Sequence, residues 1–391
     1  MAKLSSSNGI EKFPKLRFPE FKEPWNLVKL EDVCSYRKGR AKVKKAQYIS
    51  TENILQNYAG IEPYDDLSEA EGISIQCGDT LMANIRPYLK KVWQSNFNGA
   101  CSTDVLAFSP DNIDGKFLYF LIAQDRFVNY VMCGAKGSKM PRGDKNHILE
   151  YETGVPTESE QRKIAHFIDL LNARISSQNS LINLIKKYKR GLINEILSER
   201  VKLSADKWIT CRIGDFLCPK SVKQLPSEDA PLMAFTSTSG VCEKGERYDR
   251  GFLVKDVTTK MYKRTDYGDF IYSSNNIDVG SIGLNLYGAA VISDVYEIFS
   301  IRYADPWFIS ETIQQKKVIH NILKYRQGCL YGQYRIYAED FMSVHIRVPT
   351  LNIQKKIGSI FSQINRRITS EQNLLYLLEK IRASLLQQLF I

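Results

Sequence analysis

Residues 156–197 and 349–390 are two copies of one segment, and this repeat limits the possible folds more than any other feature of the chain. The copies align without a gap, so that Gln161 in the first corresponds to Gln354 in the second. Solenoid repeats have periods of about 20–50 residues, and this repeat is much longer. We therefore expect a domain-sized unit that is used twice. In the first copy the shared residues are Pro156, Thr157, Gln161, Lys163, Ile164, Asn172, Arg174, Ile175, Ser177, Leu181, Leu184, Lys187 and Leu192.

Both copies carry the apolar spacing of a coiled-coil helix, and we call the two predicted helices rods. Apolar residues recur at alternating steps of four and three, which keeps them on one face of the helix. This apolar seam consists of Ile164, Ile168, Leu171, Ile175, Ile182, Ile185, Leu192 and Ile196 in rod 1, and of Ile357, Phe361, Ile364, Ile368, Leu375, Leu378, Leu385 and Leu389 in rod 2. Polar residues interrupt both seams at matching positions, Gln178 with Glu371 and Lys189 with Arg382. Such residues cost stability but fix the register of a pair.

A helix with an apolar seam must bury it, and the other rod is the obvious partner. At a rise of 1.5 Å per residue, each rod extends roughly 60 Å. Residues 198–207 form only a short connection to the next part of the chain, and a parallel pair would need a linker that runs back along the rod. The sequence therefore favours antiparallel pairing. Two amphipathic helices that pack on separate domains are the alternative.

Composition indicates a folded, basic protein. The 391 residues, 43% hydrophobic and 25% charged, are enough for two or three domains with real cores. No apolar run approaches the roughly 18 residues that span a bilayer, and residues 1–10 lack the apolar core of a secretory signal. The eight cysteines form no C-x-x-C pair and the four histidines are scattered, so no metal site is expected. We expect a cytoplasmic protein with free thiols, and its net charge of +11 favours an acidic partner.

Each rod follows a module that begins with tryptophan, and the two modules share a few anchor points. Trp25 opens the first module and Trp208 the second, in each case at a short strand that enters a helical turn. Gly78-Asp79 matches Gly268-Asp269, which predicts a tight turn before a buried strand.

Later anchors follow in the same order. A strand at 105–108 corresponds to one at 296–299, and one helix then follows in each module, at about 114–132 and about 306–326. Beyond these anchors the modules diverge, whereas the rods stay alike. We infer that the two rods have the same function and that the two modules have two versions of one function.

These observations predict an α+β chain with two α/β modules in a pseudo-two-fold arrangement, joined by two long antiparallel coiled-coil helices. The expected parts are an N-terminal arm at 1–24, module 1 at 25–155, rod 1 at 156–199, module 2 at 200–348 and rod 2 at 349–391.

Basic and amide residues cluster on predicted loops beside glycine and tyrosine. Lysine and arginine on such loops can neutralise phosphates and position a protein on DNA, and amide and guanidinium groups can read base edges. For each single residue the alternative is a solvated surface charge. The candidate DNA-binding residues are Lys38, Arg40, Arg86, Lys90, Lys91, Lys139, Arg142, Lys260, Lys263, Arg264, Asn275, Asn276, Tyr331, Gln333 and Arg335.

Signals of enzymatic activity are weak. The chain has neither G-x-G-x-x-G nor G-x-x-x-x-G-K-[ST], and it lacks the Asn-Pro-Pro-aromatic motif of an adenine methyltransferase. Asp111 and Asp114, followed by Lys116, mimic part of a metal-dependent nuclease signature. The two acids lie only three positions apart at a predicted turn, whereas a nuclease places them on neighbouring strands. We expect no catalytic residues.

In their order and duplication, these features resemble the DNA-specificity (S) subunit of a type I restriction–modification enzyme. The resemblance extends from about Leu16 to the end of the chain, and it rests on the tryptophan-initiated modules, the Gly-Asp turns and the two Pro-x-x-x-x-Gln segments that begin the rods. Thr157 and Glu160 at the start of rod 1 form a plausible capping box. Rod 2 departs from the family pattern because Ile353 replaces the acidic residue.

The resemblance implies that each module is a target recognition domain for one half of a bipartite DNA sequence. The rods would set the half-site separation and bind two modification (M) subunits, which carry S-adenosylmethionine and methylate adenine. Two restriction (R) subunits would add ATP-driven translocation and cleavage. The chain itself would catalyse nothing and hold no cofactor. The competing hypotheses are a stand-alone DNA-acting enzyme, either a nuclease or a methyltransferase, and a coiled-coil adaptor without a role on DNA.

Overall fold

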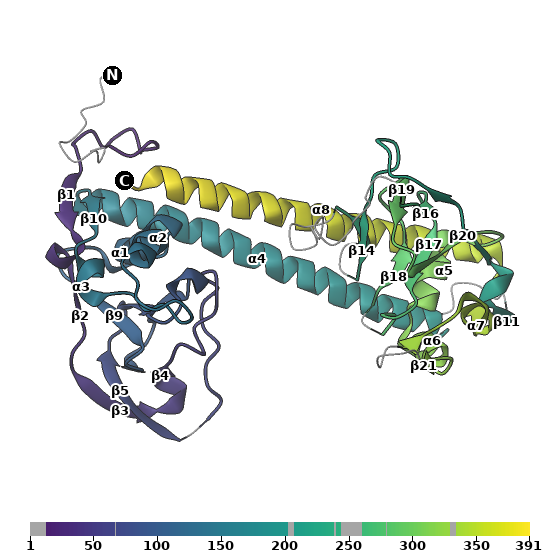
Figure 1. The fold of residues 1–391 in the computed structure, drawn as a ribbon, viewed down its shortest axis with the longest axis horizontal. Coiled ribbons are helices and arrows are strands. Elements are labelled where there is room, and N and C mark those ends of the chain that lie inside the picture. The colour runs from purple at the N-terminus through teal and green to yellow at the C-terminus, as the bar shows by residue number, and fades with distance from the viewer. Residues whose placement is uncertain are drawn as a thin grey trace. The chain divides into compact units, whose positions relative to one another are not determined.

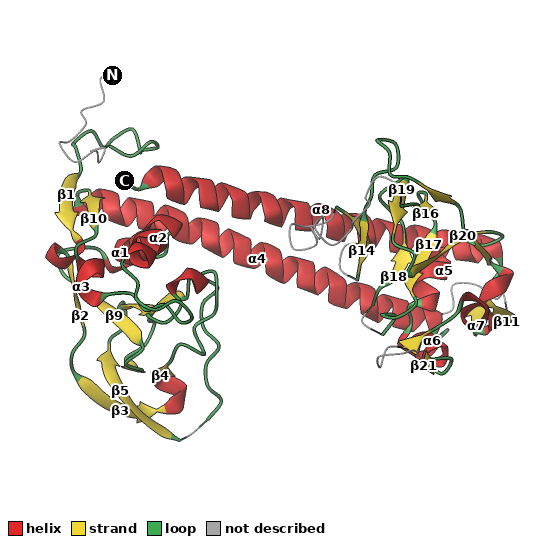
Figure 2. Ribbon diagram, viewed as in Figure 1, coloured by secondary structure: helices red, strands yellow, loops and turns green. Residues whose placement is uncertain are grey.

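The computed structural model describes residues 13–66, 68–201, 207–237, 240–243, 260–278, 280–328 and 334–391. These residues form two compact units. Unit 1 comprises 1–179 with 373–391, and unit 2 comprises 180–372. Each unit therefore holds one module, one end of rod 1 and the opposite end of rod 2. In Figure 2 the two rods are the longest helices, and the strands are confined to the modules.

Unit 1 contains two four-stranded sheets, with strand orders β2-β9-β6-β7 and β3-β5-β8-β4. A separate antiparallel pair, β1 with β10, links the start of the module to its end. The strands are β1 (Asn26–Lys29), β2 (Cys34–Tyr36), β3 (Arg40–Lys44), β4 (Tyr48–Ile49), β5 (Glu69–Ile75), β6 (Thr80–Ala83), β7 (Val92–Gln94), β8 (Gly99–Cys101), β9 (Val105–Pro110) and β10 (Glu152–Val155). The helices are α1 (Gly115–Ile122), α2 (Asp125–Cys133), α3 (Lys145–Leu149) and the first part of α4 (Glu158–Leu197).

Unit 2 repeats the central sheet with the order β12-β20-β17-β18, and β11 pairs with β23 as β1 does with β10. Its second layer differs, with the order β13-β16-β19 and a separate β14-β15 pair. The strands are β11 (Ile209–Arg212), β12 (Leu217–Pro219), β13 (Lys223–Gln224), β14 (Ala234–Thr236), β15 (Gly240–Cys242), β16 (Tyr262–Thr265), β17 (Phe270–Ser273), β18 (Ile282–Leu284), β19 (Ala290–Ile292), β20 (Tyr296–Ile301), β21 (Gln327–Gly328), β22 (Tyr334–Arg335) and β23 (His345–Val348). The helices are α5 (Pro306–Ile313), α6 (Lys316–Leu323), α7 (Ala338–Ser343) and part of α8 (Leu351–Leu389).

The two central sheets confirm the predicted correspondence between the modules. Thr80 after the first Gly-Asp turn lies opposite Phe108, and Phe270 after the second lies opposite Phe299. All four residues of β6 and of β17 are buried, as expected for strands covered on both faces.

The expected single helix in each module is two helices, so this prediction was wrong. In unit 1 the break falls at Gln124, whose backbone is extended and whose side chain donates to the Phe120 carbonyl at the end of α1. In unit 2 the break falls at Gln315, which is extended in the same way and whose side chain donates to the Glu311 carbonyl. A glutamine side chain thus satisfies a carbonyl that the interrupted helix leaves free.

The rods are α4, with 40 residues, and α8, with 39. In unit 1 the core contains Ile164 and Ile168 near the start of α4 together with Leu389 near the end of α8, and Figure 1 shows these ends side by side. In unit 2 the core joins Ile196 near the end of α4 to Ile357 near the start of α8. In both units the start of one rod therefore packs with the end of the other, which is the antiparallel pairing that the sequence favours.

The predicted seam residues all lie on the less exposed side of their helices. Those that are buried are Ile164, Ile168, Ile182, Ile196, Ile357, Phe361, Ile368 and Leu389. Those that are half-buried are Leu171, Ile175, Ile185, Leu192, Ile364, Leu375, Leu378 and Leu385.

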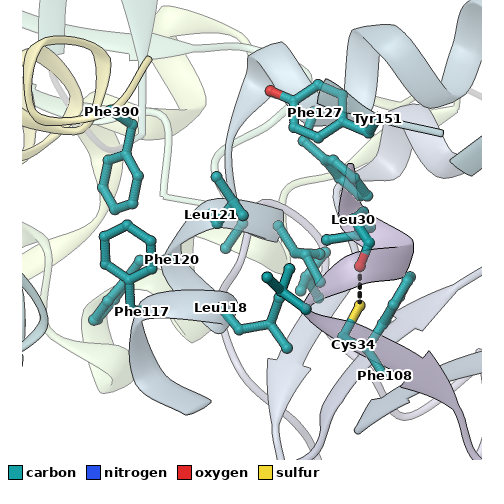
Figure 3. Close-up of a cluster of buried hydrophobic side chains, with 14 of the residues drawn as sticks. Leu30, Cys34, Phe108, Phe117, Leu118, Phe120, Leu121, Phe127, Tyr151 and Phe390 are labelled. Carbon is teal, nitrogen blue, oxygen red and sulfur yellow. Dashed lines mark hydrogen bonds between the residues drawn. The ribbon is translucent and has the colours of Figure 1, made fainter. Parts of the chain in front are cut away.

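The core of unit 1 joins the module to the end of rod 2. Phe390 points toward Phe117 and Phe120 of α1, and its ring centroid lies 5.1 Å from that of Phe117 (Figure 3). On the other side of this core, Leu30 accepts a hydrogen bond from the Cys34 thiol through its backbone carbonyl. In the part of the chain that the structure describes, no helix has the length and apolar character to cross a membrane.

Candidate nucleic-acid interface

Each rod is fixed to its module by the glutamine that both copies share. The Gln161 side chain donates to the Pro156 carbonyl at 2.9 Å and accepts from the Asp114 backbone N–H at 2.8 Å. Gln354 makes the same two hydrogen bonds in unit 2, to Pro349 and from Asp305. Asp114 and Asp305 in turn cap the first module helix. The repeated Pro-x-x-x-x-Gln motif therefore fixes each rod to the helix that backs the central sheet.

The Gly-Asp turns position the strands from which the candidate interface extends. Asp79 is 1% exposed and accepts two hydrogen bonds, both 2.9 Å long, from the Arg37 guanidinium. In unit 2 Asp269 accepts from Lys220 Nζ at 2.7 Å. A cation that follows the first central strand thus holds each turn. Arg37, although part of a basic cluster in the sequence, is engaged inside the module.

Two loops of module 1 meet at the end of β6. The first loop follows β6 (residues 84–91) and the second lies between α2 and α3 (residues 134–144). The Arg86 N–H donates to the Pro141 carbonyl at 2.8 Å, and the Gly143 N–H donates to the Asn84 carbonyl at 3.3 Å. A Cβ at Gly143 would lie 2.8 Å from Asn84 Oδ1, so the close approach of the loops requires glycine there. We call this region paired-loop surface 1.

Predicted residues from both loops lie on paired-loop surface 1. Arg86 is half-buried in a left-handed backbone conformation (φ 53°), and none of the described atoms accepts a hydrogen bond from its Nε. Arg142 is exposed and forms a 2.9 Å ion pair with Asp104. Lys139 is exposed. Tyr88 and Met140 add exposed apolar area, at 47% and 51% exposure.

The acid of this surface holds the second loop in place. Asp144 caps α3 by accepting from the Asn146 and His147 N–H groups, and it forms a 2.6 Å ion pair with Lys136. The hydrogen bond from Lys136 lowers the pKa of Asp144, and the His147 and Asn146 N–H groups add to this. The carboxylate is therefore ionised at neutral pH and fixes the start of α3 beside the loop.

The other basic candidates of module 1 point elsewhere. Lys90 forms a 2.8 Å ion pair with Asp125 of α2, and Lys91 donates to the Thr51 carbonyl at 2.5 Å. Lys38 is exposed on the β2–β3 connection. Arg40 lies on β3 and forms a 2.8 Å ion pair with Glu71 of β5. Exposed ion pairs contribute about 0–1 kcal/mol, so Arg40 could exchange its partner for a phosphate.

Module 2 brings together the corresponding loops, which follow β17 and precede α7. The Ile336 N–H donates to the Ser274 carbonyl at 3.1 Å, which places Asn275 and Asn276 beside Arg335. Asn275 is half-buried and Asn276 is exposed. We call this region paired-loop surface 2. Tyr331 and Gln333, which were predicted on the same loop, lie outside the described residues.

One carboxylate joins two of the predicted cations in module 2. Glu297 of β20 forms ion pairs with Lys263 at 2.9 Å and Arg335 at 3.0 Å. The Lys263 side chain is only 12% exposed, so the structure gives it an internal role beside any role on DNA. Arg264 pairs with Asp266, and Lys260 lies over the Tyr262 ring.

Comparisons with known proteins agree on one family. The family model described as the type I restriction modification DNA specificity domain matches residues 22–187. The EcoDI specificity subunit of Escherichia coli, a type I restriction enzyme subunit, is 20% identical over 203 residues, which cover 50% of this chain and 45% of that protein. The MjaIX specificity subunit of Methanocaldococcus jannaschii is 20% identical over 308 residues, which cover 71% of this chain and 69% of the relative. Residues 22–187 thus match a type I restriction modification DNA specificity domain, and both relatives are type I restriction enzyme specificity subunits.

Solved structures show the same fold over nearly the whole chain. The S subunit of the type I restriction–modification system from M. genitalium has a TM-score of 0.62 at 14% identity, with 97% of this chain and 99% of that chain covered. A chain from a study of complex assembly and conformational transition in the type I system has a TM-score of 0.55 at 18% identity. The match covers 94% of this chain and 98% of that chain. By contrast, the sequence alignment spans about half the length of the E. coli relative.

These similarities favour a specificity subunit over a stand-alone enzyme or an adaptor. The nuclease-like pair has a structural explanation, because Asp114 caps α1 and Asp111 follows the end of β9. Across the described ranges, no three histidine, cysteine or acidic residues gather as metal ligands would.

Sequence reasoning missed the acids that organise the loops of paired-loop surface 2. Asp278 on paired-loop surface 2 accepts from Arg326 at 3.0 Å and from the Tyr334 hydroxyl at 2.6 Å. Glu297 links Lys263 to Arg335 as described above. A search for cations and amides could not find these acids, because they are recognised only by their position opposite the cations in the fold.

Proposed function

We propose that the chain is the DNA-reading subunit of a type I restriction–modification complex, in which each module recognises one half of a bipartite target in double-stranded DNA. The observation that carries this proposal is the paired-loop surface. The same two loops meet at the end of the same buried strand in both modules, through Arg86 N–H in one and Ile336 N–H in the other. Both surfaces carry guanidinium or amide groups.

The chemistry of these groups suits DNA. Arginine binds the O6 and N7 atoms of guanine, and asparagine binds the N6 and N7 atoms of adenine, in the major groove. Lysine and arginine elsewhere on the modules would bind phosphates and fix the register on the duplex. The net charge of +11 adds a salt-dependent attraction to DNA. The different side chains of the two surfaces would give two different half-sites.

We further propose that two M subunits bind the rods. Leu184 and Leu377 occupy the same position in the two copies and are 63% and 54% exposed. Four positions further on, Tyr188 and Ile381 are 63% and 50% exposed. Apolar residues that stay exposed at matching positions of a repeat suit two copies of one partner. The rods would also set the separation of the half-sites.

The catalytic steps would then belong to the partner subunits. The M subunits would bring S-adenosylmethionine for adenine methylation, and two R subunits would bring ATP-driven translocation and cleavage. The specificity subunit would contribute recognition and placement, without a cofactor of its own.

The test is an exchange of residues 208–348 for the corresponding module of another family member. Methylome sequencing of cells that express the chimera with its M subunits should show one half-site replaced and the other unchanged. The matched control is the exchange of residues 25–155, which should replace the opposite half-site. If either exchange altered both half-sites together, the two modules would not be independent readers.

A further inference from the structure

The matched polar interruptions of the two seams, Lys189 and Arg382, have different surroundings. In unit 2 Lys189 Nζ lies 2.5 Å from Glu311 Oε1 and 2.9 Å from Asn365 Oδ1. The side chains of Lys189 and Glu311 are only 19% and 10% exposed. The half-buried cation of rod 1 therefore has a carboxylate and an amide from its own unit.

Among the described residues of unit 1, none supplies the corresponding carboxylate to Arg382 of rod 2. Glu311 lies six residues after the capping Asp305, and the residue six positions after the capping Asp114 is Phe120. Phe120 is 1% exposed and belongs to the core. Arg382 Nε is buried, and within the described residues it meets no hydrogen-bond acceptor. A buried donor without an acceptor is unfavourable, so an acceptor for Arg382 Nε from outside the chain would be favoured.

Arg382 lines a pocket of about 610 Å³ between α2, the end of α8 and the turn at residues 57–58. Leu386 and Phe390 give it an apolar wall, and Arg126, which is exposed, adds a second guanidinium group. The volume lies within the roughly 300–1,000 Å³ of small-molecule sites.

The one acid among the described residues that line this pocket is already engaged. Asp125 accepts from the Tyr58 hydroxyl at 3.1 Å and from Lys90 Nζ at 2.8 Å. Arg126 and Arg382 thus remain for an anion. Tyr58 and Lys90 both have left-handed backbone conformations, with φ values of 61° and 54°. Non-glycine residues in this conformation gather at ligand sites, where the surrounding structure holds the strain.

We propose that this pocket binds a small anionic molecule whose carboxylate or phosphate group pairs with Arg382 and Arg126. The guanidinium fork matches both anions. In unit 2 a carboxylate of the chain itself, that of Glu311, pairs with the matched cation Lys189. The apolar wall would receive the body of the ligand. The site is separate from the paired-loop surfaces, and it does not depend on the proposed DNA-reading function.

The test is a titration of the isolated full-length chain with inorganic phosphate, and separately with glutarate, at constant ionic strength. NMR of the arginine Nε–H groups reports the ligand directly, and the Arg382 signal is identified by its loss in Arg382→Gln. The expected result is a saturable shift of the Arg382 signal with at least one probe. In the variant the remaining arginine signals should show binding roughly 10- to 100-fold weaker, as expected for losing a hydrogen bond to a charged group.

Two further variants keep the test decisive. Lys189→Gln removes the matched cation that already has its carboxylate, and it should leave the titration unchanged. Arg126→Gln removes the second guanidinium group from an exposed position, so it can be used even if Arg382→Gln does not fold, and it should weaken binding. If neither probe shifts the Arg382 signal, or if the signal shifts only when M subunits are added, the small-anion proposal is overturned.

Discussion

Glu160 in unit 1 and Ile353 in unit 2 occupy the same position of the repeat but have different partners. Glu160 is 1% exposed, and its two carboxylate oxygens each lie 2.8 Å from the Arg17 guanidinium of the N-terminal arm. Trp25 Nε1 also donates to it, at 3.3 Å. Ile353 is 5% exposed and packs in the apolar core of unit 2. One helix position thus buries a charge in one unit and a hydrocarbon in the other.

The position that follows shows the opposite behaviour. Gln161 and Gln354 have kept both their identity and their hydrogen bonds. Their partners are main-chain groups, which are present whatever the neighbouring sequence is. Glu160, by contrast, depends on the side chains of Arg17 and Trp25. In this repeat, the residue whose partners are backbone groups is therefore the same in both copies. The residue whose partners are side chains differs, because those side chains differ between the two units.

The largest effect is expected when Ile353 of unit 2 is replaced by glutamate, the residue that unit 1 has at this position. Ile353→Glu would bury a carboxylate without an arginine partner and should destabilise unit 2 by about 3–5 kcal/mol at neutral pH. Burial would raise the pKa of the new carboxyl, so the destabilisation should diminish as the pH falls and the group is protonated. Denaturant unfolding with segment-resolved hydrogen exchange measures this. Leu351→Glu, at a 42% exposed position, is the control, and equal losses in both variants would contradict the comparison.

The reverse exchange should have a smaller effect. Glu160→Ile removes the acceptor of Arg17, whose side chain is only 13% exposed, and of Trp25. The expected loss is roughly 1–3 kcal/mol, confined to unit 1, because two donors are left without their acceptor. The matched control is Glu158→Ala, since the Glu158 side chain is 68% exposed and pairs with Arg162 on the surface. Hydrogen exchange in β1 would report the loss, and an unchanged exchange rate there would show that the pair is not structural.

The rods could be predicted because their signal is local. The seam, its interruptions and the shared Gln161 are visible in the printed sequence, and the two Gly-Asp turns locate the central strands. The Glu160 carboxylate, which the sequence suggests as half of a capping box with Thr157, binds Arg17 and Trp25. Its partners lie far away in sequence, where no periodicity reports them.

The candidate site was less accessible to sequence reasoning. Cations and amides could be found by type, but whether each is free depends on acids that approach only in the fold. Glu297 engages Lys263 and Arg335, whereas none of the described atoms accepts a hydrogen bond from Arg86 Nε. The helix break at Gln124 carries no glycine or proline signal. The difference between Lys189 and Arg382 also depends on the diverged modules, where Glu311 in one corresponds to Phe120 in the other.

Arg86 and Arg335 allow the two paired-loop surfaces to be compared on DNA. Arg86→Ala should weaken binding by roughly 1–3 kcal/mol if the guanidinium reads a base, and methylation mapping should show relaxed specificity in one half-site only. Arg335→Ala should have a smaller effect, because its guanidinium is held by Glu297 at 3.0 Å. Lys38→Ala, on the exposed β2–β3 connection, controls for the loss of one positive charge. A uniform loss of affinity across all sequences in Arg86→Ala would make Arg86 a phosphate contact instead.

The smallest expected effect is a difference in pH dependence between the second loops of the two paired-loop surfaces. Asp144 caps α3, whereas Tyr337 precedes α7 without a side-chain cap. The pKa of Asp144 is lowered in the folded chain, first by Lys136 and then by the His147 and Asn146 N–H groups. Its contribution to stability is therefore complete above the ordinary carboxyl pKa of about 3.9 and is lost as the pH falls through the lower folded value.

Hydrogen exchange, corrected for the intrinsic pH dependence of the amide rates, measures this difference. Protection of residues 136–143 in unit 1 should fall a few-fold on acidification through that window. The Ile336 N–H, which is bonded to Ser274 in unit 2, should not respond in the same way. Asp144→Asn keeps a good capping residue but removes the charge, so the pH dependence should disappear while most protection remains. If the variant retained the dependence, another group would be responsible, and the ion pair of Asp144 with Lys136 would not be what fixes this loop beside α3.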